Sequence, residues 1–238
     1  MPSETSHSSN PSIEELLEQF ASASMRKRRS LMSSLESRVE EISQLGDKSL
    51  DLYDPKGDDW AAGWILQLVK KYFPDSLKNF IENKQNGWFD APSSLEIDYG
   101  ILQENLLEES FQEADSFTSA MLRKLAGPEA ESRGYVYFSE VNSIPSIDLL
   151  TIDRLWIAYS QGRFGFSRQA SLLKALEGRY DRLWQRIGWK QDGIWTRYPG
   201  SFDWSINAPE GHMPLINQLR GVRLMDALLN HPSLSGRF

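Results

Sequence analysis

The sequence predicts an all-α protein in which an N-terminal helical bundle precedes a second, larger helical domain. Apolar residues recur at spacings of three and four along almost the whole chain, which is the period of an amphipathic helix. Glycine and proline residues interrupt these segments and mark the turns between helices. With 238 residues, of which 40% are hydrophobic and 25% charged, the chain can bury one large core or two modest ones.

Four helices are predicted in residues 1–92, after a short disordered tail at residues 1–10. Ser12 and Glu15 form a capping box that opens the first helix, and Gly46 ends the second. We expect a small antiparallel bundle or a helical-repeat pair. The apolar positions of the four helices are Ile13, Leu16, Leu17 and Phe20; Leu31, Leu35, Val39 and Ile42; Trp60, Trp64, Ile65, Leu68 and Tyr72; and Leu77, Phe80 and Ile81.

A change in composition at residues 85–92 places the predicted domain boundary there, so that the second domain spans residues 93–238. Its most regular helix ends at Gly127 and Pro128, a pair that stops helices. The apolar positions of the strong helix are Leu107, Phe111, Ala114, Phe117, Met121 and Leu125. Further helices are predicted at 151–160, 167–176, 179–187 and 213–229, the last burying Leu215, Leu219, Val222 and Leu229.

Five aromatic rings lie in a segment that glycine and proline residues break into turns: Trp189, Trp195, Tyr198, Phe202 and Trp204. A ring left in water forfeits about 1.5–3 kcal/mol of burial, so these rings must pack on the domain or meet an apolar partner. Asn217, Arg220 and Arg223 follow at helical spacing. We therefore interpret the segment 189–223 as a surface for a large flat ligand, with a packed loop as the alternative for each ring.

The net charge of −7 is unevenly distributed. Residues 1–92 hold 11 Lys and Arg against 15 Asp and Glu, residues 93–150 hold 3 against 11, and residues 151–238 hold 12 against 7. This balance argues against a general nucleic-acid binder and leaves a basic pocket for a small dianion open. The basic run at 25–29 is interpreted as a solvated turn without a role.

The sequence contains no catalytic constellation that we can assign. It has no cysteine, its three histidines stand far apart, and neither a nucleotide-binding phosphate loop nor a zinc-protease motif is present. The glycine-containing stretch at 162–167 is interpreted as a turn and helix cap. No apolar run approaches the length of about 18 residues needed to span a bilayer.

Six motifs, taken in order, resemble the "genomes uncoupled four" family, the porphyrin-binding accessory proteins of magnesium chelatase in cyanobacteria and plastids. They are LAGP at 125–128, YFSEV at 137–141, GRFGFS at 162–167, IGWK at 187–190, WTRYP at 195–199 and APEGHMPLINQLRGVR at 208–223. The resemblance covers about residues 95–231, and the N-terminal bundle is similar to the cyanobacterial form. Tyr198 stands where a tryptophan is expected, and it keeps an aromatic plane.

The resemblance implies two long loops, at about 127–146 and 188–214, that form a concave apolar site for protoporphyrin IX and its magnesium form. It implies that Arg220 and Arg223 are the functional arginines and that Asn217 faces the metal. Magnesium prefers oxygen ligands, so the Asn217 carbonyl, or a water that it holds, suits the axial position better than His212. The remaining porphyrin-binding residues implied are Tyr137, Phe138, Val141, Trp195, Tyr198, Phe202 and Met213.

The function expected from this resemblance is that of a non-catalytic regulator that stimulates magnesium chelatase in chlorophyll biosynthesis. Its partner would be the large porphyrin-binding subunit of the chelatase, and it would carry no covalent cofactor. The expected location is the cytoplasm of a cyanobacterium, with association with the thylakoid or a membrane surface left open. The alternatives are an enzyme acting on a tetrapyrrole and an RNA-binding module that stacks bases on the same rings.

Overall fold

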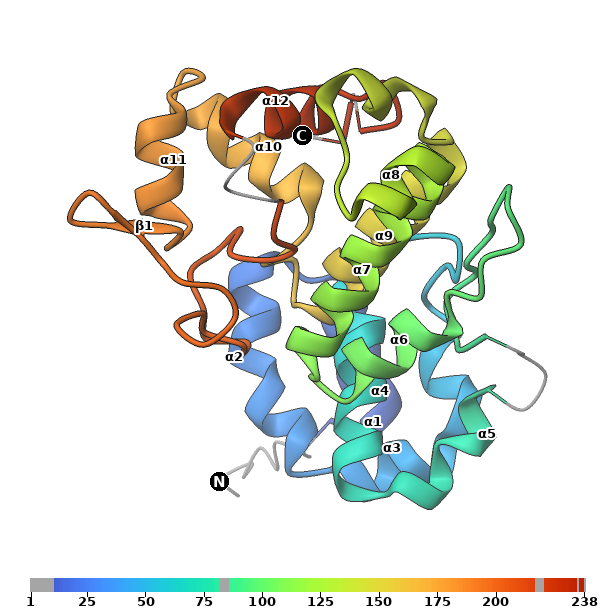
Figure 1. Ribbon diagram of the computed structural model, residues 1–238. Coiled ribbons are helices and arrows are strands. Elements are labelled where there is room, and N and C mark those ends of the chain that lie inside the picture. The colour runs from blue at the N-terminus through green and yellow to red at the C-terminus, as the bar shows by residue number, and fades with distance from the viewer. Residues whose placement is uncertain (1–10, 82–85, 217–220, 235, 238) are drawn as a thin grey trace, which may run out of the picture.

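The computed structural model describes residues 11–81, 86–216, 221–234 and 236–237 of the chain (Figure 1). The predicted all-α class is confirmed, because helices dominate these residues and the strands form one two-stranded hairpin. The helices of the N-terminal part are α1 (Ile13–Ser22), α2 (Met25–Glu36), α3 (Val39–Leu45), η1 (Gly46–Leu50), α4 (Trp60–Tyr72), η2 (Pro74–Ser76) and α5 (Lys78–Ile81). The following elements are α6 (Gly100–Leu107), α7 (Phe111–Ala126), α8 (Pro128–Arg133), η3 (Phe138–Ser143), α9 (Ser146–Tyr159), α10 (Phe166–Ala175), α11 (Tyr180–Arg186), β1 (Lys190–Gln191), β2 (Ile194–Trp195) and α12 (Gly221–Leu229).

The start of α1 confirms the predicted capping box. The Ser12 hydroxyl accepts a hydrogen bond from the backbone N–H of Glu15 at 3.1 Å, and the Glu15 carboxylate accepts one from the N–H of Ser12 at 2.9 Å. The predicted second helix is wrong in its extent, because it divides into α2 and α3. The Ser37 hydroxyl donates to the Ser34 carbonyl, and such local bonds compete with a continuous helix.

Helix α2 includes the basic run, which was predicted to lie in a turn. The Arg28 side chain is partly buried and donates two hydrogen bonds to the Asp59 carboxylate, at 2.5 and 2.8 Å. Its guanidinium also lies 5.6 Å from the centroid of the Trp60 ring, within cation–π range. Asp59 in turn accepts the N–H of Ala61 and so caps α4. One residue of the run therefore has a structural role, which is to join α2 to the start of α4.

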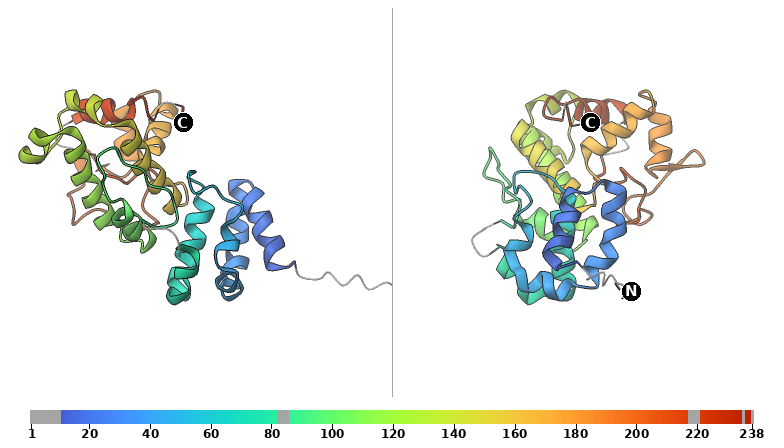
Figure 2. Two further views of the ribbon diagram at one scale, coloured as in Figure 1. Left: turned by 90° about the vertical axis from the view of Figure 1, so that its right-hand side faces the viewer. Right: turned by 180° about the vertical axis from the view of Figure 1, so that it is seen from behind.

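Helix α4 joins the N-terminal helices to the rest of the molecule by packing against α9 (Figures 1 and 2). A Cβ on Gly63 would clash with the carbonyl oxygen of Ala158, so only glycine permits this approach of the two backbones. The buried Gln67 amide donates to the carbonyls of Leu106 and Tyr159 at 2.9 and 2.8 Å. The division into domains at residue 92 stays a prediction.

The second half is built around α7 and α9, with α10, α11 and α12 at one end (Figure 1). Helix α7 begins at Phe111 and not near Leu107, which ends α6. The predicted helix at 213–229 is wrong at its start, because residues 213–216 are not helical. Val222 was predicted to be buried and is exposed. The buried positions of α12 are Leu224, Met225, Leu228 and Leu229.

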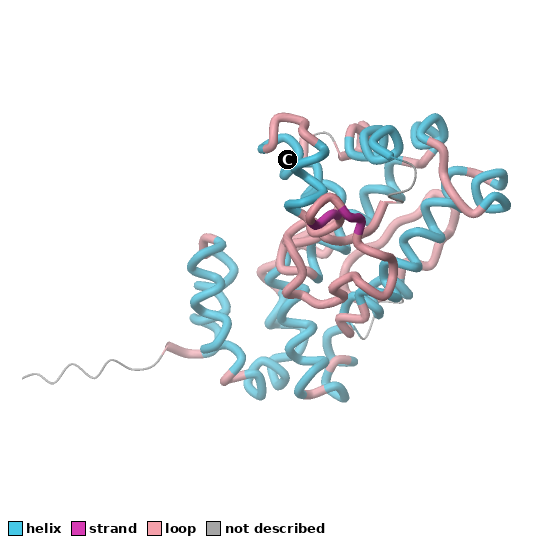
Figure 3. The backbone as a smooth tube through the Cα atoms, turned by 60° about the vertical axis from the view of Figure 1, so that its left-hand side comes forward, coloured by secondary structure: helices cyan, strands magenta, loops and turns pink. Residues whose placement is uncertain are grey.

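A hairpin of β1 and β2 lies within the aromatic segment that was predicted to be loop (Figure 3). Its turn is formed by Asp192 and Gly193, whose φ angles are +49° and +81°. Asp-Gly is the preferred sequence for a tight turn with two positive φ angles, so the turn could have been predicted. The strands are two residues each, too short for a pattern to reveal. Within the described ranges, no helix has both the length and the apolar character required to cross a bilayer.

Candidate ligand cavity

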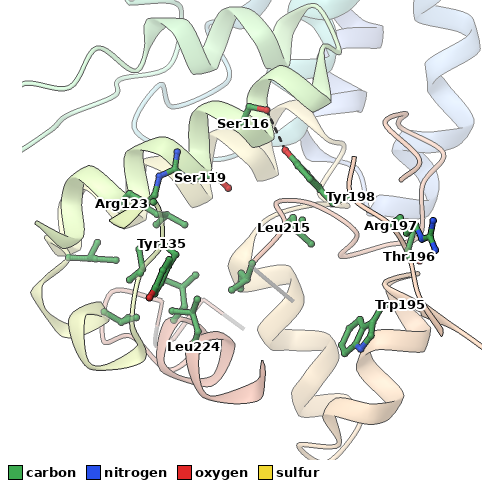
Figure 4. Close-up of a pocket in the computed structure, with 17 residues that line it drawn as sticks. Ser116, Ser119, Arg123, Tyr135, Trp195, Thr196, Arg197, Tyr198, Leu215 and Leu224 are labelled. Carbon is green, nitrogen blue, oxygen red and sulfur yellow. Dashed lines mark hydrogen bonds between the residues drawn. The ribbon is translucent and has the colours of Figure 1, made fainter. Parts of the chain in front are cut away.

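A cavity of about 710 Å³ opens between α7, the segment 134–144, the aromatic loop and α12 (Figure 4). This volume lies within the range of about 300–1,000 Å³ that is typical of pockets for small molecules and cofactors. Another hollow, of about 590 Å³, lies beside the same aromatic loop.

The α7 wall of the cavity is polar for much of its length. Ser116, Ser119 and Arg123 line it, together with Leu122. Positions spaced by three and four lie on one face of a helix, so the two hydroxyls and the guanidinium form a single polar stripe. The other face of α7 is buried through Phe111, Ala114 and Leu125.

The opposite wall is apolar and comes from three separate parts of the chain. Val141 and Ile144, on and just after η3, are buried at the base of the cavity. Leu224 and Leu228, one turn apart on α12, extend this wall. Leu215 and Ile216 complete it before the chain reaches residues outside the described part. The cavity is therefore amphipathic, with a polar wall on α7 facing an apolar one.

Two rings of the aromatic loop line the cavity, and three pack elsewhere. Trp195 is half-buried and Tyr198 is exposed, with its hydroxyl 3.5 Å from the Ser116 hydroxyl across the cavity mouth (Figure 4). Trp189 is 1% exposed and donates its indole N–H to the His212 carbonyl at 2.7 Å. Phe202 and Trp204 stack on each other, with centroids 5.5 Å apart. The packed-loop alternative therefore describes these three rings.

The residues predicted to form the site are only partly brought together. Val141, Trp195 and Tyr198 line the cavity. Met213 and Phe202 are buried in the packed part of the loop and do not line it. Tyr137, Phe138 and Arg223 are exposed beside it, and the Arg223 guanidinium lies 5.5 Å from the centroid of the Phe138 ring. Asn217 and Arg220 lie outside the described residues.

Sequence reasoning missed the contribution of α7 to the cavity. Ser116, Ser119 and Arg123 line the cavity but were not predicted to do so, because the prediction for that helix rested on its apolar positions. Their spacing of three and four was visible in the sequence as a second, polar periodicity on the same helix. Nothing in that pattern distinguishes a stripe that faces a cavity from one that faces water.

Asp115 is a buried acid immediately behind the cavity. It is fully buried, and one of its oxygens accepts the N–H of Leu215 at 2.6 Å. The other oxygen has no hydrogen-bond partner within the described part of the chain. Burial raises the pKa of Asp115 to about 7, while the Leu215 N–H and the nearby Tyr198 hydroxyl act to lower it. This carboxyl therefore holds the segment that forms part of the apolar wall.

His212 lies away from the large cavity and beside the smaller hollow, of about 590 Å³, on the other side of the loop. Its Nδ1 atom is 2.6 Å from the Ile187 carbonyl oxygen, which identifies Nδ1 as the protonated nitrogen. Burial lowers the pKa of this imidazole. Among the described residues, no group of three or more His, Asp or Glu side chains is arranged to hold a metal ion.

Comparison with known proteins identifies the family. The GUN4-like family model matches residues 92–232, which is more than half of the chain, and the protein belongs to this family. The family resemblance predicted from the six motifs is thereby confirmed. The α1–α5 part of the chain lies before the matched region.

Relatives occur in cyanobacteria and in plants. The Ycf53-like protein of Synechocystis sp. is 42% identical over 173 residues, which cover 72% of this chain and 74% of that protein. The chloroplastic tetrapyrrole-binding protein of Arabidopsis thaliana is 35% identical over 146 residues, covering 58% of this chain and 55% of that protein. The solved structure of GUN4 from Chlamydomonas reinhardtii superimposes with a TM-score of 0.58 and 39% identity, over 61% of this chain and 93% of the other.

Proposed function

We propose that this chain binds a tetrapyrrole in the cavity between α7 and α12. The observation that carries the proposal is the amphipathic cavity of about 710 Å³, with an aromatic loop at its mouth and a polar stripe on one side. The proposal is also supported by the family, since one relative is described as a tetrapyrrole-binding protein.

The physical chemistry of a tetrapyrrole suits these walls. A porphyrin is a flat apolar ring system with two propionate groups, so it requires apolar and aromatic contacts for the ring and cationic donors at one edge. Val141, Leu224 and Leu228 offer the apolar surface, and Tyr198 and Trp195 offer aromatic planes. Burial of about 300 Å² of ring contributes roughly 7 kcal/mol before ordering costs, which suffices for reversible binding without a covalent bond.

Within this proposal the ligands are protoporphyrin IX and its magnesium form. The magnesium would enter as part of the ligand, with Asn217 supplying an oxygen toward it directly or through water. Arg220 and Arg223 would bind propionates. These three roles rest on the family resemblance, and of the three residues only Arg223 lies in the described part of the chain.

The proposed role in the cell is that of a regulator that acts without catalysis. It would deliver a porphyrin to the large subunit of magnesium chelatase or ease product release from it, and so stimulate chlorophyll biosynthesis. We expect this to occur in the cytoplasm of a cyanobacterium, at or near the thylakoid surface. This part of the proposal is supported by membership of the family.

The test of binding uses a variant that fills the cavity. Ser119→Trp places an indole on the cavity wall of α7, and Lys124→Trp places the same side chain on the exposed face of the same helix. Titration of magnesium deuteroporphyrin, followed by its absorbance shift, should saturate for the wild type and for Lys124→Trp. Ser119→Trp should weaken binding about tenfold or more because the ligand loses its space. Equal binding by all three proteins would place the ligand elsewhere.

A second experiment separates the regulator from an enzyme. The purified protein is incubated with protoporphyrin, magnesium and ATP, with and without the chelatase subunits. Faster magnesium insertion only when the subunits are present supports the regulatory role. Product formed without them would identify an enzyme, and salt-sensitive binding to single-stranded RNA would favour the nucleic-acid alternative.

A further inference from the structure

The guanidinium of Arg123 lies on the cavity wall without an anionic partner among the described residues. Arg123 is half-buried, and none of the ion pairs formed within the described chain includes it. The sequence offers no local partner either, since positions three and four residues away on either side are Ser, Ala, Ala and Gly. By contrast, the half-buried Arg133 on the next helix pairs with Glu140 at 2.6 Å.

A partly buried cation without an anionic partner is a favourable binding position for an anion. A guanidinium that is partly removed from water loses hydration, and that loss is offset when a carboxylate or phosphate binds to it. Neighbouring hydroxyl groups on α7 can add hydrogen bonds to an anion bound at Arg123. The Ser119 hydroxyl, one turn earlier, makes no hydrogen bond within the described chain, and the Ser116 hydroxyl has only the 3.5 Å contact with Tyr198.

The shape and polarity of the cavity restrict the anion to one edge of a mostly apolar molecule. Two described cations line the cavity, the half-buried Arg123 on α7 and the exposed Arg197 in the aromatic loop, and the wall of Val141, Leu224 and Leu228 that faces α7 offers no charge. A ligand that satisfied both walls would carry its carboxylate on one side and apolar surface on the other. A carboxylate also matches the planar fork of a guanidinium, which binds it through two parallel hydrogen bonds.

We propose that Arg123, with Ser119, forms a carboxylate-binding subsite on α7 that takes one propionate of the tetrapyrrole. This inference rests on the proposed function and deepens it. The subsite belongs to α7, about 100 residues earlier in the sequence than Arg220 and Arg223. It orients the ligand in the cavity with one acidic edge against α7 and the ring against the apolar wall.

The experiment compares a diacid ligand with its neutral ester in the full-length protein. Deuteroporphyrin IX and its dimethyl ester are titrated in the same buffer with the same small fraction of dimethyl sulfoxide. The variants are Arg123→Gln, which removes the charge, and Arg123→Lys, which keeps the charge and loses the fork. Lys124→Gln removes one positive charge from the exposed face of the same helix and is the matched control.

Arg123→Gln should weaken binding of the diacid about 10-fold to 100-fold and change binding of the ester by less than about twofold. Arg123→Lys should recover part of the loss, and Lys124→Gln should change neither ligand. Equal losses for diacid and ester would show that Arg123 only packs, and unchanged diacid binding would show that no carboxylate reaches it. Either result overturns the subsite while leaving tetrapyrrole binding intact. A wild-type protein that binds neither porphyrin would overturn the proposed function, and the subsite with it.

Discussion

Helices α4 and α9 meet with almost no space between their backbones, whereas α7 and α12 are separated by a cavity of about 710 Å³. The closed contact depends on Gly63, which lets the Ala158 carbonyl approach, and on Gln67, whose amide hydrogen bonds are buried. The open region has the longer side chains of Arg123 and Leu224 on its facing helices. Both regions share one continuous apolar core, so the difference arises from residue size and polarity at the contact.

This comparison shows how a small helical protein can hold a cavity open. An unfilled space costs stability because its lining atoms lack contacts on one side. The closed α4–α9 contact supplies rigid packing beside it, reinforced by the Arg237 guanidinium. Arg237 lies 2.5 Å from Asp58 before α4 and 2.9 Å from the buried Asp153 of α9. We therefore expect stability to depend on the closed contact and ligand affinity on the open one.

The largest effect on stability is expected from Gly63→Ala. In an ordinary helix this change is stabilising by about 1 kcal/mol, but here the new Cβ would meet the Ala158 carbonyl oxygen. We expect a loss of about 3 kcal/mol in the free energy of unfolding, measured by urea denaturation. Gly200→Ala is the control, because a Cβ at Gly200 would have no neighbour within 4 Å. Similar free energies of unfolding for both variants would show that the α4–α9 contact accommodates the added methyl group without loss of stability.

A smaller effect is expected from the buried acid beside the cavity. Burial raises the pKa of Asp115 to about 7 from its ordinary value of 3.8, so the folded protein holds this proton where the unfolded chain releases it. The protonated Asp115 carboxyl therefore makes its full contribution to the stability of the folded protein below about pH 4. This contribution is lost as the pH rises toward 7. Asp115→Asn cannot lose a proton. As the pH rises from 5 to 8, its free energy of unfolding should therefore increase by about 2 kcal/mol relative to that of the wild type.

The measurement for Asp115 is the free energy of unfolding at several pH values for the wild type, Asp115→Asn and Glu113→Gln. Glu113 is an exposed acid on the same helix and provides the control. A constant difference between Asp115→Asn and the wild type across this range would mean that the Leu215 N–H keeps the Asp115 carboxylate ionised throughout.

The smallest effect on stability is expected from Tyr198→Phe. The hydroxyl that it removes is 3.5 Å from Ser116, at the limit of a hydrogen bond, and the Tyr198 side chain is exposed. We expect a change of less than about 0.5 kcal/mol in the free energy of unfolding, against the much larger loss for Gly63→Ala. A loss above about 1 kcal/mol would mean that the contact across the cavity mouth belongs to the core.

Much of the helical architecture could be predicted from local sequence patterns. The capping box at Ser12, the end of α7 before Gly127 and the turn at Gly165 all follow from rules that operate over a few residues. At the turn, the Ser167 N–H donates to Asp153 at 2.8 Å, which confirms that the glycine-containing stretch opens a helix. The division of the second predicted helix at Ser37 was missed because apolar periodicity continues across the break.

The residues of the candidate site were harder to predict from the sequence than the helices. Phe202 and Met213 are as apolar as Val141 and Leu224, yet the first two are enclosed by packing and only the other two face the cavity. Periodicity reports that a side chain leaves water, and it does not report whether a protein atom or a ligand replaces that water. Arg123 shows the converse, since a cation on a helix is normally assigned to the solvated face.

The sequence by itself determined the all-α class, the approximate positions of most helices and the membership of the GUN4-like family, because local spacing and ordered motifs carry that information. Only the tertiary structure decided which helices close on each other and which leave a cavity. Gly63 and Ser119 lie 56 positions apart on different helices, and the space beside each depends on a partner segment distant in the chain. Packing of that kind is a property of three-dimensional neighbours, so it emerges only when the helices are assembled.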